Sequence, residues 1–166
     1  IIWDPILKAS AGFQFHDGEN LTQLQDILRK IYLITPNTDE LKTLFGNHPD
    51  VESLQALARG LNLNILWKGG HNDGALASDR LVTPDKVYTF SVTRARHGKH
   101  GTGCVLSSAI ASYLTLGYPL PDACRLGQHY VAGFIRSNDT NLGMHNRVES
   151  TVPEVDLYRI PLQYIT

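Results

Sequence analysis

The run His100-Gly101-Thr102-Gly103-Cys104 lies directly before the segment with the strongest helical pattern. Glycines let a backbone bend closely around a ligand, and the first turn of a helix offers unpaired N–H groups with partial positive charge. We therefore predict an anion site here, with phosphate as the favoured ligand. The same field favours the thiolate of Cys104. The alternative interpretation is a glycine turn with a small buried cysteine, and both stay open on these residues alone.

Three further motifs could contribute charge or ligands. Asn37-x-x-Glu40 is typical of a helix-capping box, and a capped helix at a strand end can also present Glu40 to a metal-bound water. Lys68-Gly69-Gly70 is either an exposed strand exit or a lysine that reaches a nucleotide phosphate. Asp4 either caps a turn before Pro5 or neutralises Mg²⁺. Each motif keeps its structural and its functional interpretation.

Two other kinds of site are disfavoured. His97, His100 and Cys104 could be considered as zinc ligands, but a zinc site needs a fourth group, and the neighbouring sequence offers no convincing one. The sequence also lacks the G-x-x-x-x-G-K-[ST] phosphate loop, which argues against a P-loop NTPase. Cys124 lies within a helical apolar stripe, so we predict that it packs in the core.

The elements that position these residues alternate between strands and helices. Apolar patterns, caps and turn residues predict strands at 1–4, 32–35 and 63–67, a hairpin over 75–93 that turns at Thr83-Pro84-Asp85, and helices at 21–31 (capped by Asn20), 38–45, 51–59 (ended by Gly60), 102–116 and 121–135. This order predicts an α/β fold, with a mostly parallel sheet flanked by helices. In such sheets ligands bind beyond the carboxyl ends of the strands, so Asp4, Asn37 and Lys68 should share one edge.

The composition limits the range of partners. The 166 residues are 42% hydrophobic, and 15 basic against 16 acidic residues give a net charge of −1. Nothing in that balance predicts nucleic-acid binding or attraction to an anionic membrane, and the apolar runs are too short to span one. Two cysteines fit a reduced, cytoplasmic protein better than a disulfide framework. A small-molecule substrate is the expected partner, and a homo-oligomer is compatible with the sequence.

The first residues, Ile1-Ile2-Trp3-Asp4-Pro5, carry no initiator Met and have the pattern of a buried strand. Chain termini are usually frayed and polar. We therefore expect residues 1–166 to be the C-terminal part of a single domain whose N-terminal part is missing. A processed chain is the alternative.

Four motifs in this order resemble the hydroxymethylpyrimidine and phosphomethylpyrimidine kinases of thiamine biosynthesis, which belong to the ribokinase-like superfamily. The motifs are Trp3-Asp4-Pro5, Thr35-Pro36-Asn37-x-x-Glu40, Trp67-Lys68-Gly69-Gly70-His71 and His100-Gly101-Thr102-Gly103-Cys104-x-Leu106-Ser107-Ser108-Ala109-Ile110-Ala111. The cysteine that ends the glycine turn makes the resemblance specific, because most ribokinase relatives carry Asp there. The resemblance covers residues 1 to about 137.

The resemblance implies transfer of the γ-phosphoryl group of Mg-ATP to a hydroxymethyl group, or to an existing phosphate, on a pyrimidine. It places Gly101, Thr102, Gly103 and Cys104 in the anion hole, with Cys104 also as the catalytic base. By the same resemblance Lys68 stabilises the ATP phosphates, Asn37 lies near them, and Asp4 and Glu40 hold Mg²⁺ directly or through water. These residues are therefore the predicted site.

Departures from the family pattern leave two alternatives open. Some cysteine-type kinases of this fold phosphorylate pyridoxal, so a pyridoxal kinase is the alternative enzyme. A complete family member has a substantial part before the Asp-Pro strand, so this chain could instead be a noncatalytic phosphate-binding fragment that self-associates. In addition, the loop over 94–99 is more basic than the family's usual run.

Overall fold

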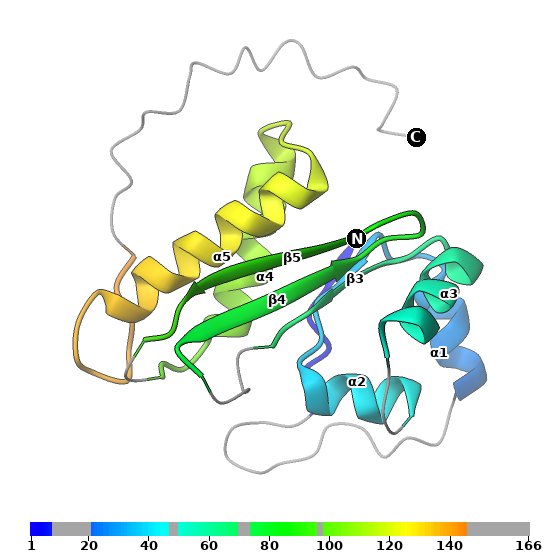
Figure 1. The fold of residues 1–166 in the computed structure, drawn as a ribbon, viewed down its shortest axis with the longest axis horizontal. Coiled ribbons are helices and arrows are strands. Elements are labelled where there is room, and N and C mark those ends of the chain that lie inside the picture. The colour runs from blue at the N-terminus through cyan, green and yellow to red at the C-terminus, as the bar shows by residue number, and fades with distance from the viewer. Residues whose placement is uncertain (8–20, 47–49, 70–73, 96–97, 146–166) are drawn as a thin grey trace.

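Five strands pair in chain order into one sheet, with helices against both of its faces (Figure 1). In the computed structural model, residues 1–7, 21–46, 50–69, 74–95 and 98–145 are described. The strands are β1 (Ile2–Trp3), β2 (Leu33–Ile34), β3 (Asn64–Trp67), β4 (Leu76–Val82) and β5 (Val87–Thr93). The helices are α1 (Leu21–Leu28), α2 (Thr38–Phe45), α3 (Val51–Leu61), α4 (Thr102–Thr115) and α5 (Leu120–Arg136).

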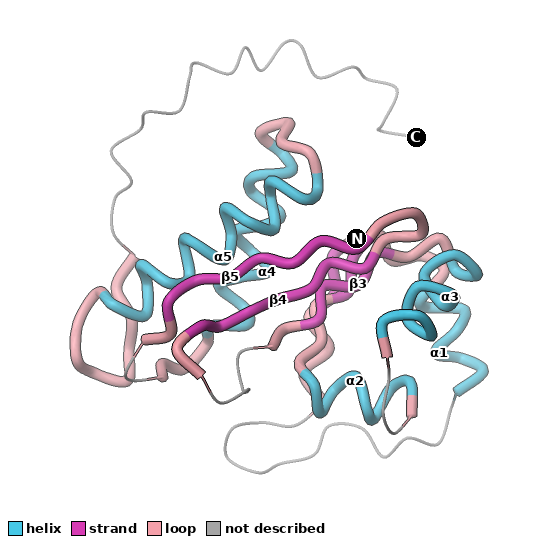
Figure 2. Tube along the Cα trace, in the orientation of Figure 1, coloured by secondary structure: helices cyan, strands magenta, loops and turns pink. Residues whose placement is uncertain are grey.

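The sheet is mixed, because a hairpin extends a parallel unit. β1, β2 and β3 pair in parallel, whereas β4 runs antiparallel to β3 and β5 antiparallel to β4. Figure 2 shows β3, β4 and β5 as neighbouring magenta strands. Thr83 Oγ1 accepts a hydrogen bond of 2.9 Å from the backbone N–H of Lys86 and closes the turn between β4 and β5. The predicted hairpin and the helices that flank the sheet are confirmed.

Successive strand residues point to opposite faces of the sheet, and each face has its own hydrophobic core. Leu33 and Ile34 of β2 are both fully buried, yet Ile34 belongs to the core beneath α1, α2 and α3, and Leu33 to the core beneath α4 and α5. Burial on both faces explains why this strand is a continuous apolar run. Helices α4 and α5 approach closely at Gly127, where an added Cβ would lie 2.8 Å from Ile110 Cγ1.

Some predicted boundaries were wrong. Helix α3 continues through Gly60 to Leu61. Its C-cap is Asn62, whose left-handed backbone (φ 52°) is one that Asn tolerates better than most residues. The first strand is half-buried at the sheet edge, with Ile1 78% exposed, and is not the buried strand that its apolar run predicted. The predicted 21–31 helix ends at Leu28.

Several predictions concern residues outside the described ranges: Asn20 as a cap, Gly70 and His71 after the third strand, and His97 as a candidate ligand. None of the helices in the described part of the chain is long and apolar enough to cross a bilayer.

Candidate active site

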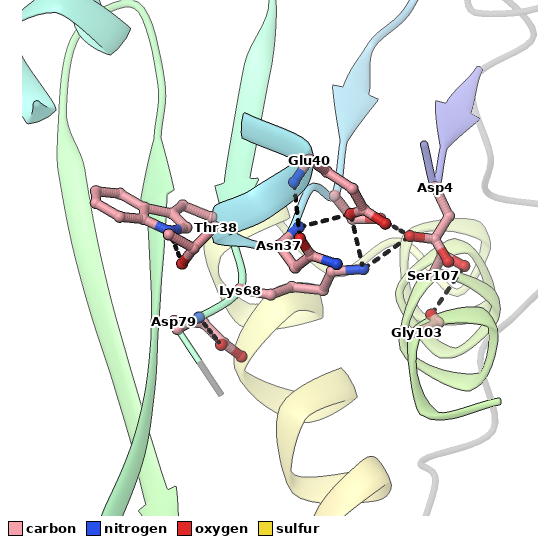
Figure 3. A network of polar contacts seen from close by, with 11 residues as sticks. Asp4, Asn37, Thr38, Glu40, Lys68, Asp79, Gly103 and Ser107 are labelled. Carbon is pink, nitrogen blue, oxygen red and sulfur yellow. Dashed lines mark hydrogen bonds and ion pairs between the residues drawn. The ribbon is translucent and has the colours of Figure 1, made fainter. Parts of the chain in front are cut away.

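The carboxyl ends of the three parallel strands bring their following residues together. Asp4 follows β1, Asn37 lies between β2 and α2, and Lys68 follows β3 (Figure 3). Asn37 and Lys68 form a parallel bridge, and the Lys68 backbone N–H donates to the carbonyl oxygen of Pro36 at 2.8 Å. The predicted shared edge is therefore confirmed, and it is held by main-chain pairing.

One ammonium group faces two carboxylates at this edge. Lys68 Nζ donates to Asp4 Oδ1 at 2.8 Å and lies 3.8 Å from Glu40 Oε2. The three side chains are largely withdrawn from solvent, with exposures of 16% for Lys68, 11% for Asp4 and 12% for Glu40. Asp4 Oδ1 also accepts from the buried Thr35 hydroxyl at 3.1 Å. Asp4 is thereby fixed from two directions.

The capping-box interpretation of the Asn37-x-x-Glu40 motif is confirmed. Asn37 Oδ1 accepts from the Glu40 backbone N–H at 2.8 Å, and Glu40 Oε2 accepts from the Asn37 backbone N–H at 2.7 Å. This capping box begins α2 and also aims Glu40 at Lys68. Burial raises the pKa of Glu40, and the hydrogen bond from Asn37 and the charge of Lys68 oppose that rise.

The glycine turn packs directly against this charged group. Gly101 is left-handed (φ 78°) and precedes α4, which begins at Thr102 without a side-chain cap. A Cβ added to Gly103 would lie 3.0 Å from Asp4 Oδ2 and 3.2 Å from Lys68 Nζ, so only glycine leaves this space open. Four segments far apart in the sequence therefore meet at one point.

The two cysteines lie in opposite environments. Cys104 is exposed in the first turn of α4, so the interpretation of a small buried cysteine is wrong at this position. Cys124 is 1% exposed in the core beneath α4 and α5, where burial raises the pKa of its thiol to about 12. The predicted packing role of Cys124 is confirmed, and Cys104 is the thiol that faces solvent.

A cavity of about 620 Å³ connects these residues with β4, β5 and α5. Its lining includes Asp4, Glu40 and Lys68 together with the turn that leads into α4. Its lining also includes the cations Arg94 and Lys99 and apolar side chains such as Val92, Val131 and Ile135. The cavity is thus lined by charged side chains of both signs and by apolar side chains.

Sequence reasoning missed two polar residues that also line this cavity. Asp79 is 8% exposed, and Gln128 is 6% exposed. Asp79 Oδ1 accepts from the Gly69 N–H at 3.0 Å, and Asp79 Oδ2 accepts from Gln128 Nε2 at 2.9 Å. The available signal was an aspartate at the centre of a predicted strand, where charge is unusual.

The basic loop before the glycine turn has a structural use. Lys99 Nζ donates to the backbone oxygen and to Oδ1 of Asn138, each at 2.8 Å, and also to the carbonyl oxygen of Thr140. Arg94 Nε donates to the carbonyl oxygen of Gly74 at 2.8 Å. These bonds tie Arg94 and Lys99 to neighbouring segments.

The donor set also bears on a metal ion. Within the described ranges no group of three or more His, Cys, Asp and Glu side chains converges on one point. Asp4 and Glu40 nevertheless face one cation, Lys68, from two sides. Mg²⁺ is commonly held by one or two carboxylates together with substrate phosphates and water, so these two residues fit Mg²⁺ that arrives with a nucleotide.

Known proteins with similar sequences are enzymes of thiamine biosynthesis. The chain is 35% identical over 143 residues to the thiamine biosynthesis bifunctional protein ThiED of Geobacter sulfurreducens. This alignment covers 82% of the chain and 29% of that protein. It is 32% identical over 139 residues to a hydroxymethylpyrimidine/phosphomethylpyrimidine kinase of Staphylococcus aureus, covering 78% of this chain and 50% of that one. The chain thus spans half or less of the length of these relatives.

The fold and the family follow from two further matches. The pyridoxal kinase from Staphylococcus aureus in complex with AMP-PCP superposes with a TM-score of 0.69 at 22% identity, over 89% of this chain and 59% of that chain. This likeness shows the ribokinase-like fold. The family described as phosphomethylpyrimidine kinase matches residues 1–149. Because that match takes in nearly all of the sequence, the chain belongs to the phosphomethylpyrimidine kinase family.

Proposed function

We propose that the protein carrying this chain phosphorylates hydroxymethylpyrimidine, its monophosphate, or both, with ATP as phosphoryl donor. The observation that carries the proposal is the meeting of Lys68 and Asp4, 2.8 Å apart, beside Gly103 at the start of α4. Phosphoryl transfer depends chiefly on positioning and on stabilising negative charge. A fixed lysine beside an uncapped helix start supplies both.

The residues of the glycine turn and Lys68 have separate roles in this reaction. Backbone N–H groups of Gly101 to Cys104 stabilise the negative charge of the phosphoryl group in the transition state, and Lys68 holds the phosphates of ATP. Cys104 accepts the proton of the substrate hydroxyl. The substrate oxygen then forms its bond to the γ-phosphorus as the bond between that phosphorus and the bridging oxygen breaks, and ADP leaves.

Asp4 and Glu40 are the residues that would hold Mg²⁺, with Asn37 near the phosphates. The ion, when bound, neutralises phosphate charge. Lys68 keeps the two carboxylates close together through its contacts of 2.8 and 3.8 Å. The Asn37 cap fixes the orientation of Glu40.

The test is ATP-dependent phosphorylation of hydroxymethylpyrimidine by the complete protein and by its Cys104→Ala variant. We expect turnover by the wild type, and a kcat lower by a factor of about 10² to 10⁴ in the variant, which has lost its general base. Cys124→Ala is the matched control, since that thiol lies in the core away from the turn. Full activity in Cys104→Ala would contradict the role of this thiol as general base. A wild type that does not phosphorylate the pyrimidine would contradict the proposed substrate.

A pyridoxal kinase is the second candidate, because a pyridoxal kinase superposes with a TM-score of 0.69. Values of kcat/KM for pyridoxal and hydroxymethylpyrimidine, measured on one preparation, decide between them. We expect the pyrimidine to be preferred.

Two cysteines without a disulfide support a cytoplasmic location as part of this proposal.

The 166-residue chain measured alone tests the noncatalytic alternative. We expect it to turn over substrate poorly and to self-associate, because Ile1 and the half-buried strand β1 leave an apolar sheet edge exposed. A monomer with the full rate of the complete protein would contradict this expectation.

A further inference from the structure

Asp79 is a buried carboxylate without an assigned role in the proposed reaction. It is 8% exposed, it lies in the middle of β4, and it lines the same cavity as Lys68. Burying a charged group away from water is costly unless hydrogen bonds compensate for the lost hydration. Asp79 has such bonds from two different elements, and these bonds indicate what the residue does.

The first bond continues the strand pairing at the point where the backbone ladder stops. β3 and β4 pair through Trp67 opposite Arg80, and the antiparallel register would next place Lys68 opposite Asp79. Beyond that pair, the Asp79 side chain accepts the Gly69 N–H at 3.0 Å. Lys68 is therefore held on both sides, since its own N–H donates to Pro36 at 2.8 Å. The carboxylate fixes the direction in which the chain leaves Lys68.

The second bond ties this carboxylate to α5. Gln128 Nε2 donates to Asp79 Oδ2 at 2.9 Å and approaches the carbonyl oxygens of Phe90 and Ala77 at 3.3 and 3.4 Å. With three acceptors around this nitrogen, the amide cannot be reversed without facing its oxygen toward them. Gln128 Oε1 is buried and has no hydrogen-bond partner within the described residues. The side chain thus satisfies Asp79 and leaves its own acceptor unused.

We infer that Asp79 and Gln128 form a positioning pair that orients Lys68 toward the phosphates of the nucleotide. This inference rests on the proposed function of Lys68. The pair links α5 to the residue that follows Lys68, so the ammonium keeps its place beside Asp4 and Gly103. Neither Asp79 nor Gln128 needs to touch the reacting atoms.

A double-mutant cycle with Lys68 tests this inference. The variants are Asp79→Asn, Lys68→Met and the double variant, each measured for affinity to the ATP analogue AMP-PCP and for kcat/KM with ATP. Asn at position 79 keeps the size, but one of the two oxygens that accept from Gly69 and Gln128 is replaced by an NH2 donor. We expect Asp79→Asn to weaken nucleotide affinity about tenfold in the presence of Lys68, and less than about twofold in the Lys68→Met background. Asp85→Asn, at the exposed turn of the same hairpin, is the control and should match the wild type.

Equal losses in the two backgrounds would overturn the inference, because they would show a role in stability that does not pass through Lys68. If Asp79→Asn does not fold, Gln128→Met tests the same cycle. It removes one partner of Asp79 and keeps the Gly69 bond, and we expect a loss of about threefold that again disappears without Lys68. An unchanged affinity in folded Gln128→Met would also contradict the inference. The AMP-PCP measurement needs no acceptor substrate, so a failure of the proposed pyrimidine activity is recognised separately.

Discussion

Helices α2 and α3 begin with the same local motif, but the two motifs lie in different surroundings. In α2, Asn37 and Glu40 exchange hydrogen bonds of 2.8 and 2.7 Å; in α3, Asp50 and Ser53 exchange bonds of 2.6 and 3.2 Å. The α3 box is exposed, whereas Glu40 is 12% exposed and lies 3.8 Å from Lys68. A capping box alone therefore predicts a helix start. The strand end that faces the box determines whether its side chains also meet other charged groups.

The start of α4 extends this contrast. Gly101 provides no side-chain cap, so the first N–H groups of α4 are not satisfied in the way that those of α2 and α3 are. Gly103 places this uncapped start against Asp4 and Lys68. A helix start without a cap is expensive in a purely structural setting but useful where an anionic ligand supplies the missing acceptors.

The largest effect is expected from Lys68→Met, which removes the cation that Glu40 faces. We expect kcat/KM for ATP to fall by a factor of about 10² to 10³, as when a charge-stabilising group is removed from an active site. Lys42→Met, on the exposed side of α2, is the control and should retain activity. Steady-state kinetics of the two variants measures the difference. Equal activities of Lys68→Met and Lys42→Met would mean that the cation facing Glu40 does not contribute to catalysis.

The next effect is expected from Gly103→Ala. The new methyl group would lie 3.0 Å from Asp4 Oδ2 and 3.2 Å from Lys68 Nζ, so both charged groups must shift. We expect kcat/KM to fall about tenfold, because small displacements of positioning groups are costly in catalysis. Gly133→Ala in α5 is the matched control, since its added Cβ meets nothing within 4 Å, and it should gain up to about 1 kcal/mol in stability. Retained activity in folded Gly103→Ala would contradict the claim that the glycine turn is part of the active site.

A smaller effect separates the two capping boxes directly. Asn37→Ala should lower the free energy of unfolding by about 1 kcal/mol, as the loss of an N-cap does. It should also lower kcat/KM about threefold, because Glu40 loses its fixed orientation. Asp50→Ala should destabilise the protein in the same direction and leave kcat/KM unchanged. Denaturant unfolding and kinetics on both variants provide the data, and a parallel loss of activity in Asp50→Ala would contradict the distinction.

The smallest effect is a difference in pH dependence. Burial raises the pKa of Glu40 above its ordinary 4.5, so the folded state retains a proton that the unfolded state loses. The contribution of Glu40 to stability therefore decreases as pH rises from about 4.5. Hydrogen bonds from Ser53 lower the pKa of Asp50 below 3.8, so its contribution increases as pH rises toward that value.

Urea unfolding between about pH 3 and 7 tests these opposite signs. As pH rises, the Glu40→Gln variant should gain stability relative to wild type, and the Asp50→Asn variant should lose stability relative to wild type. Changes of the same sign in both variants would show that the two carboxylates titrate in similar environments.

Local signals predicted α2 well, because both of its ends are marked within the helix itself. Asn37 and Glu40 cap its start, and Gly46 ends it with a positive φ of 93°, which glycine adopts readily. The rule that parallel strands end at one edge was enough to bring Asp4 near Lys68 across 64 residues.

Where the signal depends on tertiary contacts, the sequence was not sufficient. Gly60 resembles a helix stop, but α3 continues because Leu61 packs in the core and Asn62 takes the left-handed position. The bond between Asp79 and Gln128 joins residues 49 positions apart, and neither belongs to a recognisable motif. The role of Asp79 depends on how α5 lies on the hairpin, which no local pattern encodes.

The most direct test of the central claim is a crystal structure of the complete protein with AMP-PCP and Mg²⁺. We predict terminal phosphate oxygens within about 3.2 Å of Lys68 Nζ and of backbone nitrogens between Gly101 and Cys104. Phosphates bound elsewhere, with Lys68 still paired only to Asp4 and Glu40, would contradict the claim that these segments form the phosphate site.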